Sequence, residues 1–183
     1  MANALSLLRL FMAPPFGLLM SRADAQFALY AAILYCAAVA TDLLDGVVAR
    51  RRGTASQLGG TLDHAADFLF VTVGLAAMAW RGAILWVLPA LVVLAFAQYV
   101  IDSLWVDGGG ELRMSFVGRC NGILYFVPVG GDIAVRLGLA GLAAPVEWVA
   151  WLLVGTTLVS MADRLCARPT RLRRARDSRD SER

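Results

Sequence analysis

The feature that most constrains this chain is a series of apolar stretches, each about as long as a bilayer is thick. A spanning helix needs roughly 20 mostly apolar residues, and about six such stretches lie near residues 5–20, 27–47, 58–80, 84–104, 116–135 and 146–162. Barrel strands are disfavoured because the stretches lack the alternation of a lipid-facing strand. Apolar residues make up 59% of the chain, above the roughly 45–50% of soluble domains. We therefore predict an all-α membrane protein, a bundle of about six transmembrane helices.

The arginines predict how this bundle is oriented, because cytoplasmic loops of membrane proteins carry an excess of basic residues. With the N-terminus in the cytoplasm, most arginines fall on the cytoplasmic side: Arg9, Arg50, Arg51, Arg52, Arg113, Arg119 and those of the tail from Arg164 to Arg183. Only Arg22, Arg81 and Arg136 fall on the opposite side. We predict an integral protein of a bacterial inner or plasma membrane, with both termini cytoplasmic.

The end of the chain differs from the rest in composition. Residues 166–183 are polar and rich in arginine, and such a segment cannot bury a core. We predict a six-helix transmembrane domain at 1–165 and a disordered cytoplasmic tail at 166–183. The tail is interpreted as a topology signal with affinity for anionic lipid headgroups, and nucleic acid is not an expected partner. The spacing of Cys36, Cys120 and Cys166 predicts neither disulfides nor a zinc site, and we interpret them as core residues.

Four aspartates interrupt two of the apolar stretches. An aspartate at the centre of a transmembrane helix costs about 2.5–3.5 kcal/mol on insertion scales, so each one needs an explanation. Asp42 and Asp45 are three residues apart at the end of the second stretch, and Asp63 and Asp67 are four apart at the start of the third. Each pair therefore shares one helix face. The short, basic connection between them predicts antiparallel neighbours, with all four carboxylates near the inner membrane surface.

Carboxylates that face one another repel unless cations lie between them. Oxygen ligands without His or Cys suit Mg²⁺, Mn²⁺ or Ca²⁺, and such ions assist phosphoryl transfer by neutralising oxygens of the transferred and leaving groups. The alternative is a set of interhelical Arg–Asp pairs that lock the bundle, with Arg50, Arg51 and Arg52 as partners.

The same segment resembles the signature of a known enzyme family. It matches every fixed position of the CDP-alcohol phosphatidyltransferase signature, eight specified residues across 26 positions: Asp42, Asp45, Gly46, Ala49, Arg50, Gly59, Asp63 and Asp67. The resemblance implies an enzyme of phospholipid biosynthesis, typically a homodimer with its active site open to the cytoplasm. An alcohol hydroxyl would attack the lipid-bearing β-phosphate of CDP-diacylglycerol, and CMP would leave.

The resemblance also assigns roles within this segment. Asp42, Asp45 and Asp63 would bind Mg²⁺ or Mn²⁺, while Asp67 would be the general base and would also touch metal. The residues around the CDP moiety would be Gly46, Ala49, Arg50 and Gly59. From the sequence alone, the small residues among them favour either close approach of a ligand or tight helix packing.

The start of the chain matches the family less closely. Asn3, Ser6, Arg9 and Pro14 resemble the pattern that opens many bacterial members. Three-residue spacing places Asn3, Ser6 and Arg9 on one helix face, where they could reach a nucleotide or a phosphate; the alternative is an N-terminal cap and interface anchor. Pro14 and Pro15 predict a kink or break in this helix.

The signature does not determine which alcohol accepts the phosphatidyl group. Arg119 and Asn121, at the start of the fifth stretch, are candidates to bind an acceptor phosphate; the alternative for Arg119 is an interface anchor. Phosphatidylglycerophosphate synthases usually have Pro after the third aspartate and Lys after the fourth, where this chain has His64 and Phe68. Glycerol 3-phosphate is our first expectation, with serine or an inositol phosphate as the alternative. The non-enzymatic alternative is a metal-binding membrane carrier.

Overall fold

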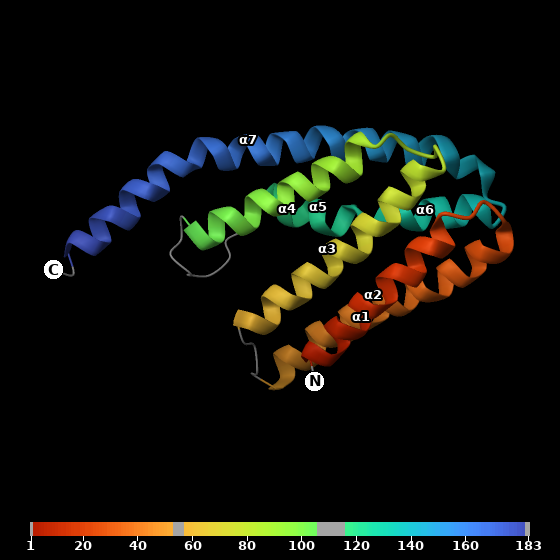
Figure 1. Ribbon diagram of the computed structural model, residues 1–183, viewed down its shortest axis with the longest axis horizontal. Helices are drawn as coiled ribbons and strands as arrows, with labels where there is room; N and C mark the ends of the chain where they lie inside the picture. Colours follow the sequence, from red (N-terminus) through yellow and green to blue (C-terminus); the bar gives the residue numbers. More distant parts are fainter. Residues whose placement is uncertain (1, 53–56, 106–115, 182–183) are drawn as a thin grey trace.

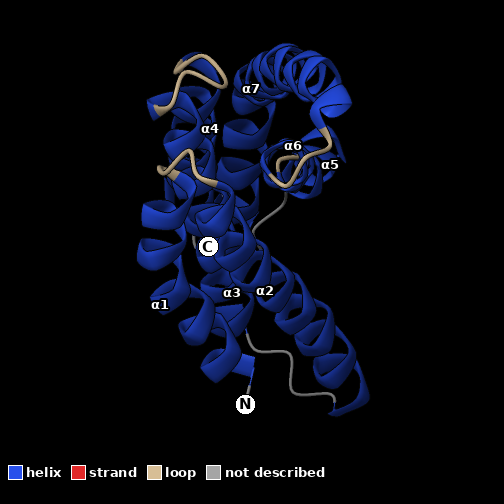
Figure 2. Ribbon diagram, turned by 90° about the vertical axis from the view of Figure 1, so that its right-hand side faces the viewer, coloured by secondary structure: helices blue, strands red, loops and turns tan. Residues whose placement is uncertain are grey.

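The computed structural model describes the backbone of residues 2–52, 57–105 and 116–181, and the side chains of 5–43, 63–102 and 118–166. These residues form helices and no strands (Figure 2), which confirms the all-α prediction. In chain order the helices are α1 (Ala2–Met20), α2 (Ala25–Arg52), α3 (Gln57–Trp80), α4 (Val87–Trp105), α5 (Phe116–Leu124), α6 (Phe126–Arg136), the 3-10 helix η1 (Ala140–Leu142) and α7 (Ala143–Ser181).

Several of the described connections between helices lie at one end of the bundle (Figure 1). The α1–α2, α3–α4 and α6–α7 connections, at residues 21–24, 81–86 and 137–142, lie together there, and we call this the turn end. The N-terminus of α1 and the start of α3 lie toward the opposite, N-terminal end. The last part of α7 projects beyond the other helices (Figure 1).

Helix α1 packs between α2 and α3 along most of its length. The rings of Phe16 and Phe70 stack with centroids 4.3 Å apart, and both side chains are fully buried. A Cβ added to Gly17 would lie 2.3 Å from Cγ1 of Val73, so α1 and α3 approach closely there. Helix α1 continues through Pro14 and Pro15, so the break that was predicted as one of two outcomes, beside a kink, does not occur. Each proline removes one helical hydrogen bond, and packing of α1 against α2 and α3 offsets this local loss.

The fifth apolar stretch is two helices and not one. Helix α5 ends at Leu124 and α6 begins at Phe126, with Tyr125 between them. Pro128 lies in the first turn of α6 and has no N–H to donate to the carbonyl four residues earlier, so a helix bends or ends at this point. The expected span at 116–135 is corrected to this broken pair.

Two described stretches are long and apolar enough to cross a membrane by length and composition, Ala25–Leu43 and Ala140–Cys166. Leu5–Met20 and Val87–Asp102 are shorter apolar helices. Large apolar side chains are exposed along the outside of the helices, among them Phe11, Leu18 and Ile33. An exterior of this kind is suited to lipid and not to water, and the protein is a membrane protein.

Two smaller expectations are corrected. Cys36 and Cys166 are exposed and Cys120 is half-buried, so they are not core residues; on a lipid-facing exterior an apolar thiol needs no burial within the protein. Helix α7 continues to Ser181, where disorder was predicted for 166–183. Arginine, leucine and alanine are good helix formers, and they allow the apolar helix to continue into the polar segment.

Candidate active site

Three of the four predicted aspartates meet between α2 and α3. Asp42 comes from the second half of α2, and Asp63 and Asp67 come from the first half of α3. One carboxylate oxygen from each lies within 4.8 Å of the other two. The side chain of Asp45 lies outside the described residues. The antiparallel pairing expected from the short connection therefore brings acidic groups of both helices to one place.

A buried arginine from α1 lies among these carboxylates. Arg9 is fully buried; its Nη1 is 3.2 Å from Oδ1 of Asp63 and also contacts Asp67, and its Nη2 is 3.4 Å from Oδ1 of Asp42. Ser6, one turn earlier, donates a hydrogen bond to Oδ1 of Asp63 at 3.2 Å. Ser6 and Arg9 do share a face, as predicted, and that face meets the carboxylates.

The donor set fits a divalent cation. The three carboxylates remain accessible, with 45% of the Asp42 side chain, 30% of Asp63 and 24% of Asp67 exposed. Oxygen ligands from aspartates are those that Mg²⁺ and Mn²⁺ prefer. If all three are ionised, Arg9 neutralises one of the three negative charges, and a divalent cation would balance the remaining two.

The carboxylates open onto a cavity of about 770 Å³, within the range of small-molecule sites in proteins. Residues of α2, α3, α4, α5, α6 and α7 line this cavity. Besides the carboxylates, the polar residues of the lining include His64, Arg119 and Asn121, and its apolar residues include Val39 and Leu43. The two predicted acceptor residues thus share one cavity with the acidic cluster. Asn121 is buried and its Nδ2 is 3.5 Å from Oγ1 of Thr157, while Arg119 is exposed.

Sequence reasoning missed a second polar group in this cavity. Arg164 of α7 is buried and its guanidinium carbon lies 5.1 Å from the ring centroid of Tyr99. Gln98 and Tyr99 of α4 line the cavity with it, and Asp102 is buried one turn further along α4. The signal that could have found this group is Asp102, a fifth aspartate inside an apolar stretch, to which the same insertion cost applies.

Several predicted residues cannot be placed at the site. The side chains of Asn3, Asp45, Gly46, Ala49, Arg50 and Gly59 lie outside the described residues. Their assignments stay predictions.

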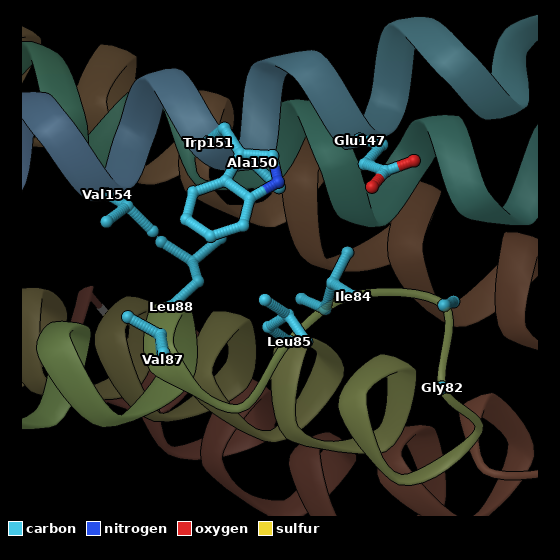
Figure 3. Close-up of a pocket in the computed structure, with 10 residues that line it drawn as sticks. Gly82, Ile84, Leu85, Val87, Leu88, Glu147, Ala150, Trp151 and Val154 are labelled. Atoms are coloured by element: carbon cyan, nitrogen blue, oxygen red, sulfur yellow. The ribbon is translucent and has the colours of Figure 1, made fainter.

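A smaller cavity lies near the turn end. It has a volume of about 150 Å³ and is bounded by the α3–α4 connection, the start of α4 and α7 (Figure 3). Glu147 is the charged residue of its lining, which also includes the apolar residues Leu88 and Trp151. A single exposed carboxylate in an apolar wall gives no metal site.

Comparison with known proteins shows which family builds such a site. The family model described as CDP-alcohol phosphatidyltransferase matches residues 1–162. The chain belongs to the CDP-alcohol phosphatidyltransferase family. This match covers the acidic cluster, Arg9, and the cavity residues other than Arg164, and it identifies the protein as a phosphatidyltransferase enzyme.

Individual relatives agree with the family assignment. A CDP-diacylglycerol--glycerol-3-phosphate 3-phosphatidyltransferase of Pseudomonas fluorescens is 33% identical over 174 residues, covering 90% of this chain and 88% of that protein. A probable phosphatidylglycerophosphate synthase of Mycobacterium tuberculosis is 27% identical over 157 residues, covering 84% and 75%. A third relative, from Escherichia coli K12 and with the same name as the first, is 29% identical over 121 residues, covering 63% and 66%.

Proposed function

We propose that this phosphatidyltransferase transfers the phosphatidyl group of CDP-diacylglycerol to glycerol 3-phosphate and releases CMP. The observation that carries this proposal is the convergence of Asp42, Asp63 and Asp67 at the wall of the cavity of about 770 Å³. The atoms balance: the acceptor oxygen forms a bond to the β-phosphorus of the CDP-lipid, the bond from that phosphorus to the bridging oxygen breaks, and the acceptor proton passes to a base.

The acidic cluster would hold Mg²⁺ or Mn²⁺ through Asp42, Asp63 and Asp67, with Asp45 as the fourth ligand implied by the signature. When bound, such an ion neutralises charge on the phosphate oxygens and on the departing CMP. The residues of the chain then fix where the diphosphate lies, and the small residues Gly46, Ala49 and Gly59, with Arg50, would surround the CDP moiety.

Asp67 is proposed as the general base on the acceptor hydroxyl. It is the least exposed of the three carboxylates, lines the cavity beside Phe68, and is contacted by Arg9. A base must come within hydrogen-bond reach of the proton it takes, and a position on the cavity wall supports that geometry.

Glycerol 3-phosphate is proposed as the acceptor because relatives across Pseudomonas, Mycobacterium and Escherichia are named for it or for its product. An acceptor with its own phosphate needs a cation in the cavity. Arg119 and Arg164 both line the cavity and are the candidates to supply this cation. Serine has no phosphate and would not use such a cation.

We further propose a homodimer in which six membrane segments span the bilayer, with α5 and α6 counted as one, and in which the acidic cluster lies near the cytoplasmic surface. Exposed tryptophans at the turn end, Trp80, Trp86 and Trp148, support an outer membrane interface there, since tryptophan prefers this region. Along α3, Asp67 precedes Trp80 by 13 residues, a rise of about 20 Å. With a hydrocarbon core about 30 Å thick, the carboxylates would lie within about 10 Å of its inner boundary.

The test is an acceptor screen with purified protein in nanodiscs. CDP-diacylglycerol and Mg²⁺ are supplied with glycerol 3-phosphate, serine or inositol phosphate, and lipid products are identified by mass spectrometry. The proposal predicts phosphatidylglycerophosphate together with CMP. Another lipid product would reject the acceptor but keep the reaction type, whereas no CMP with any alcohol would reject the function.

A further inference from the structure

The acidic cluster already contains a cation. Arg9 has no exposed surface, and its guanidinium lies within 3.4 Å of oxygens from Asp42, Asp63 and Asp67. These aspartates come from two different helices, and Arg9 comes from a third. One side chain therefore holds three carboxylates together across α1, α2 and α3.

The hydrogen bonds of Arg9 are incomplete in this arrangement. Nη1 is bonded to Asp63 and Asp67, but Nε and Nη2 are buried and make no hydrogen bond. A buried guanidinium with unsatisfied donors is costly, so charge attraction to the three carboxylates must add to the hydrogen bonds of Nη1 to hold it there. A cation that binds the three carboxylates more completely than Arg9 does can therefore replace its guanidinium.

The carboxylates cannot serve both cations fully. A metal ion that takes oxygens of Asp42, Asp63 and Asp67 as ligands would lie only a few ångströms from the guanidinium. Two positive charges at such a distance repel in a site that is partly screened from water. The metal must either displace Arg9 from the carboxylates or bind more weakly in its presence.

We propose that Arg9 is a resident counter-cation that keeps the carboxylates together before metal binds, and that divalent metal competes with it for them. This inference rests on the proposed metal site. The sequence predicts that Arg9 contacts a nucleotide or a phosphate, whereas the role inferred here is in metal binding. Arg9 is a positioning residue in this account: it acts on the site through the three aspartates.

The test measures Mn²⁺ binding without any substrate, by the electron paramagnetic resonance signal of free Mn²⁺. Wild type is compared with Arg9→Gln, which removes the charge, and with Arg9→Lys, which keeps it. The control is Ser21→Ala, because Ser21 lies at the opposite end of α1, where its hydroxyl bonds the Leu18 carbonyl, away from the carboxylates. Loss of a unit charge a few ångströms from a divalent ion should tighten Mn²⁺ binding at least about tenfold in Arg9→Gln, with Arg9→Lys and Ser21→Ala close to wild type.

Thermal unfolding tests the same proposal if Arg9→Gln folds poorly. Each variant is heated in detergent with EDTA and with saturating Mn²⁺. Arg9→Gln should unfold at a lower temperature than wild type in EDTA and recover in Mn²⁺, since either cation can hold the carboxylates. Binding of Mn²⁺ that is unchanged or weaker in Arg9→Gln, or instability that Mn²⁺ does not relieve, would overturn the proposal. Both readouts are independent of CMP release, so failure of the proposed reaction would not be confused with failure of this inference.

Discussion

At the scale of single residues, the site depends on side chains from α1 as much as on the aspartates. Ser6 is buried and its hydroxyl donates to Asp63, while Arg9 contacts all three described carboxylates. A carboxylate with a fixed donor is held in one rotamer, which a metal ligand requires. The first turns of α1 are therefore part of the site and not only a membrane anchor.

Removal of the Ser6 hydroxyl should therefore weaken the protein. Ser6→Ala removes one of the two donors to Oδ1 of Asp63, the other being Nη1 of Arg9, so we expect a loss of about 0.5–1.5 kcal/mol in the free energy of unfolding. Unfolding in detergent, followed by tryptophan fluorescence, gives this value. Ser21→Ala is the control, because Ser21 bonds only the nearby Leu18 carbonyl and is solvent-accessible; it should change stability by less than about 0.5 kcal/mol. Equal effects of the two changes would argue against the Ser6–Asp63 bond.

Replacement of the proposed base tests a different property of the same cluster. Asp67→Asn keeps the size of the side chain but cannot accept the acceptor proton, so turnover should fall by about 10²–10⁴-fold. Binding of CDP-diacylglycerol, measured by isothermal titration in nanodiscs, should remain close to wild type. Turnover within a few-fold of wild type would reject Asp67 as the base.

At the scale of elements, the close approach of α1 to α3 sets where Arg9 meets the carboxylates. Gly17 and Gly74 lie at this contact, with Gly74 facing Phe16 and Val129. Because α1 is one rigid helix, a displacement at Gly17 moves Arg9 as well. Packing close to the turn end of the bundle thus affects geometry at its N-terminal end.

Gly17→Ala should separate the two helices. The new Cβ would meet Cγ1 of Val73 at 2.3 Å, and overpacking of this kind costs about 1–3 kcal/mol. Gly155→Ala, a helical glycine of α7 with open space around it, is the control and should leave stability unchanged or raise it by up to about 1 kcal/mol. Thermal unfolding of both variants checks the pair, and a Gly17→Ala protein as stable as Gly155→Ala would contradict the packing argument.

The elements also show how far the sequence could predict the structure. The two aspartate pairs and their short connection were sufficient to predict that α2 and α3 bring acidic groups together, because residue spacing fixes helix faces. Spacing did not predict that Arg9 would lie among them, since that depends on the tertiary packing of α1. The continuity of α1 through Pro14 and Pro15 and the break at Tyr125 have the same origin: proline weakens a helix locally, and surrounding contacts decide whether it ends.

At the scale of the whole molecule, the two ends differ in chemistry. The N-terminal end carries the acidic cluster and the large cavity. The turn end carries exposed tryptophans and an ion pair between Arg81 and Asp132, in which Nη2 of Arg81 lies 2.5 Å from Oδ2 of Asp132. Arg81 also donates through Nε to the carbonyl of Met20 at 2.6 Å, so it ties the end of α1 to α6. This difference supports one fixed orientation in the membrane.

The orientation can be measured with a protease-cleavable tag. A tag after Arg183 should be cut in inside-out membrane vesicles and protected in intact spheroplasts, because the arginine-rich end is expected in the cytoplasm. A second tag, inserted in the α3–α4 connection after Gly82, should show the reverse. Cleavage of both tags from the same side would contradict the proposed orientation.

Asp42, Asp63 and Asp67 are proposed to form one divalent-cation site on which the transfer depends. The most direct measurement is CMP release from CDP-diacylglycerol and glycerol 3-phosphate by wild type and Asp63→Asn, in EDTA and with added Mg²⁺. Asp24→Asn, at the turn end, is the control. We predict release only with Mg²⁺, a loss of at least about 100-fold in Asp63→Asn because a metal ligand contributes several kcal/mol to transition-state stabilisation, and unchanged release in Asp24→Asn. Release that persists in EDTA, or that survives in Asp63→Asn at the wild-type rate, would contradict the claim.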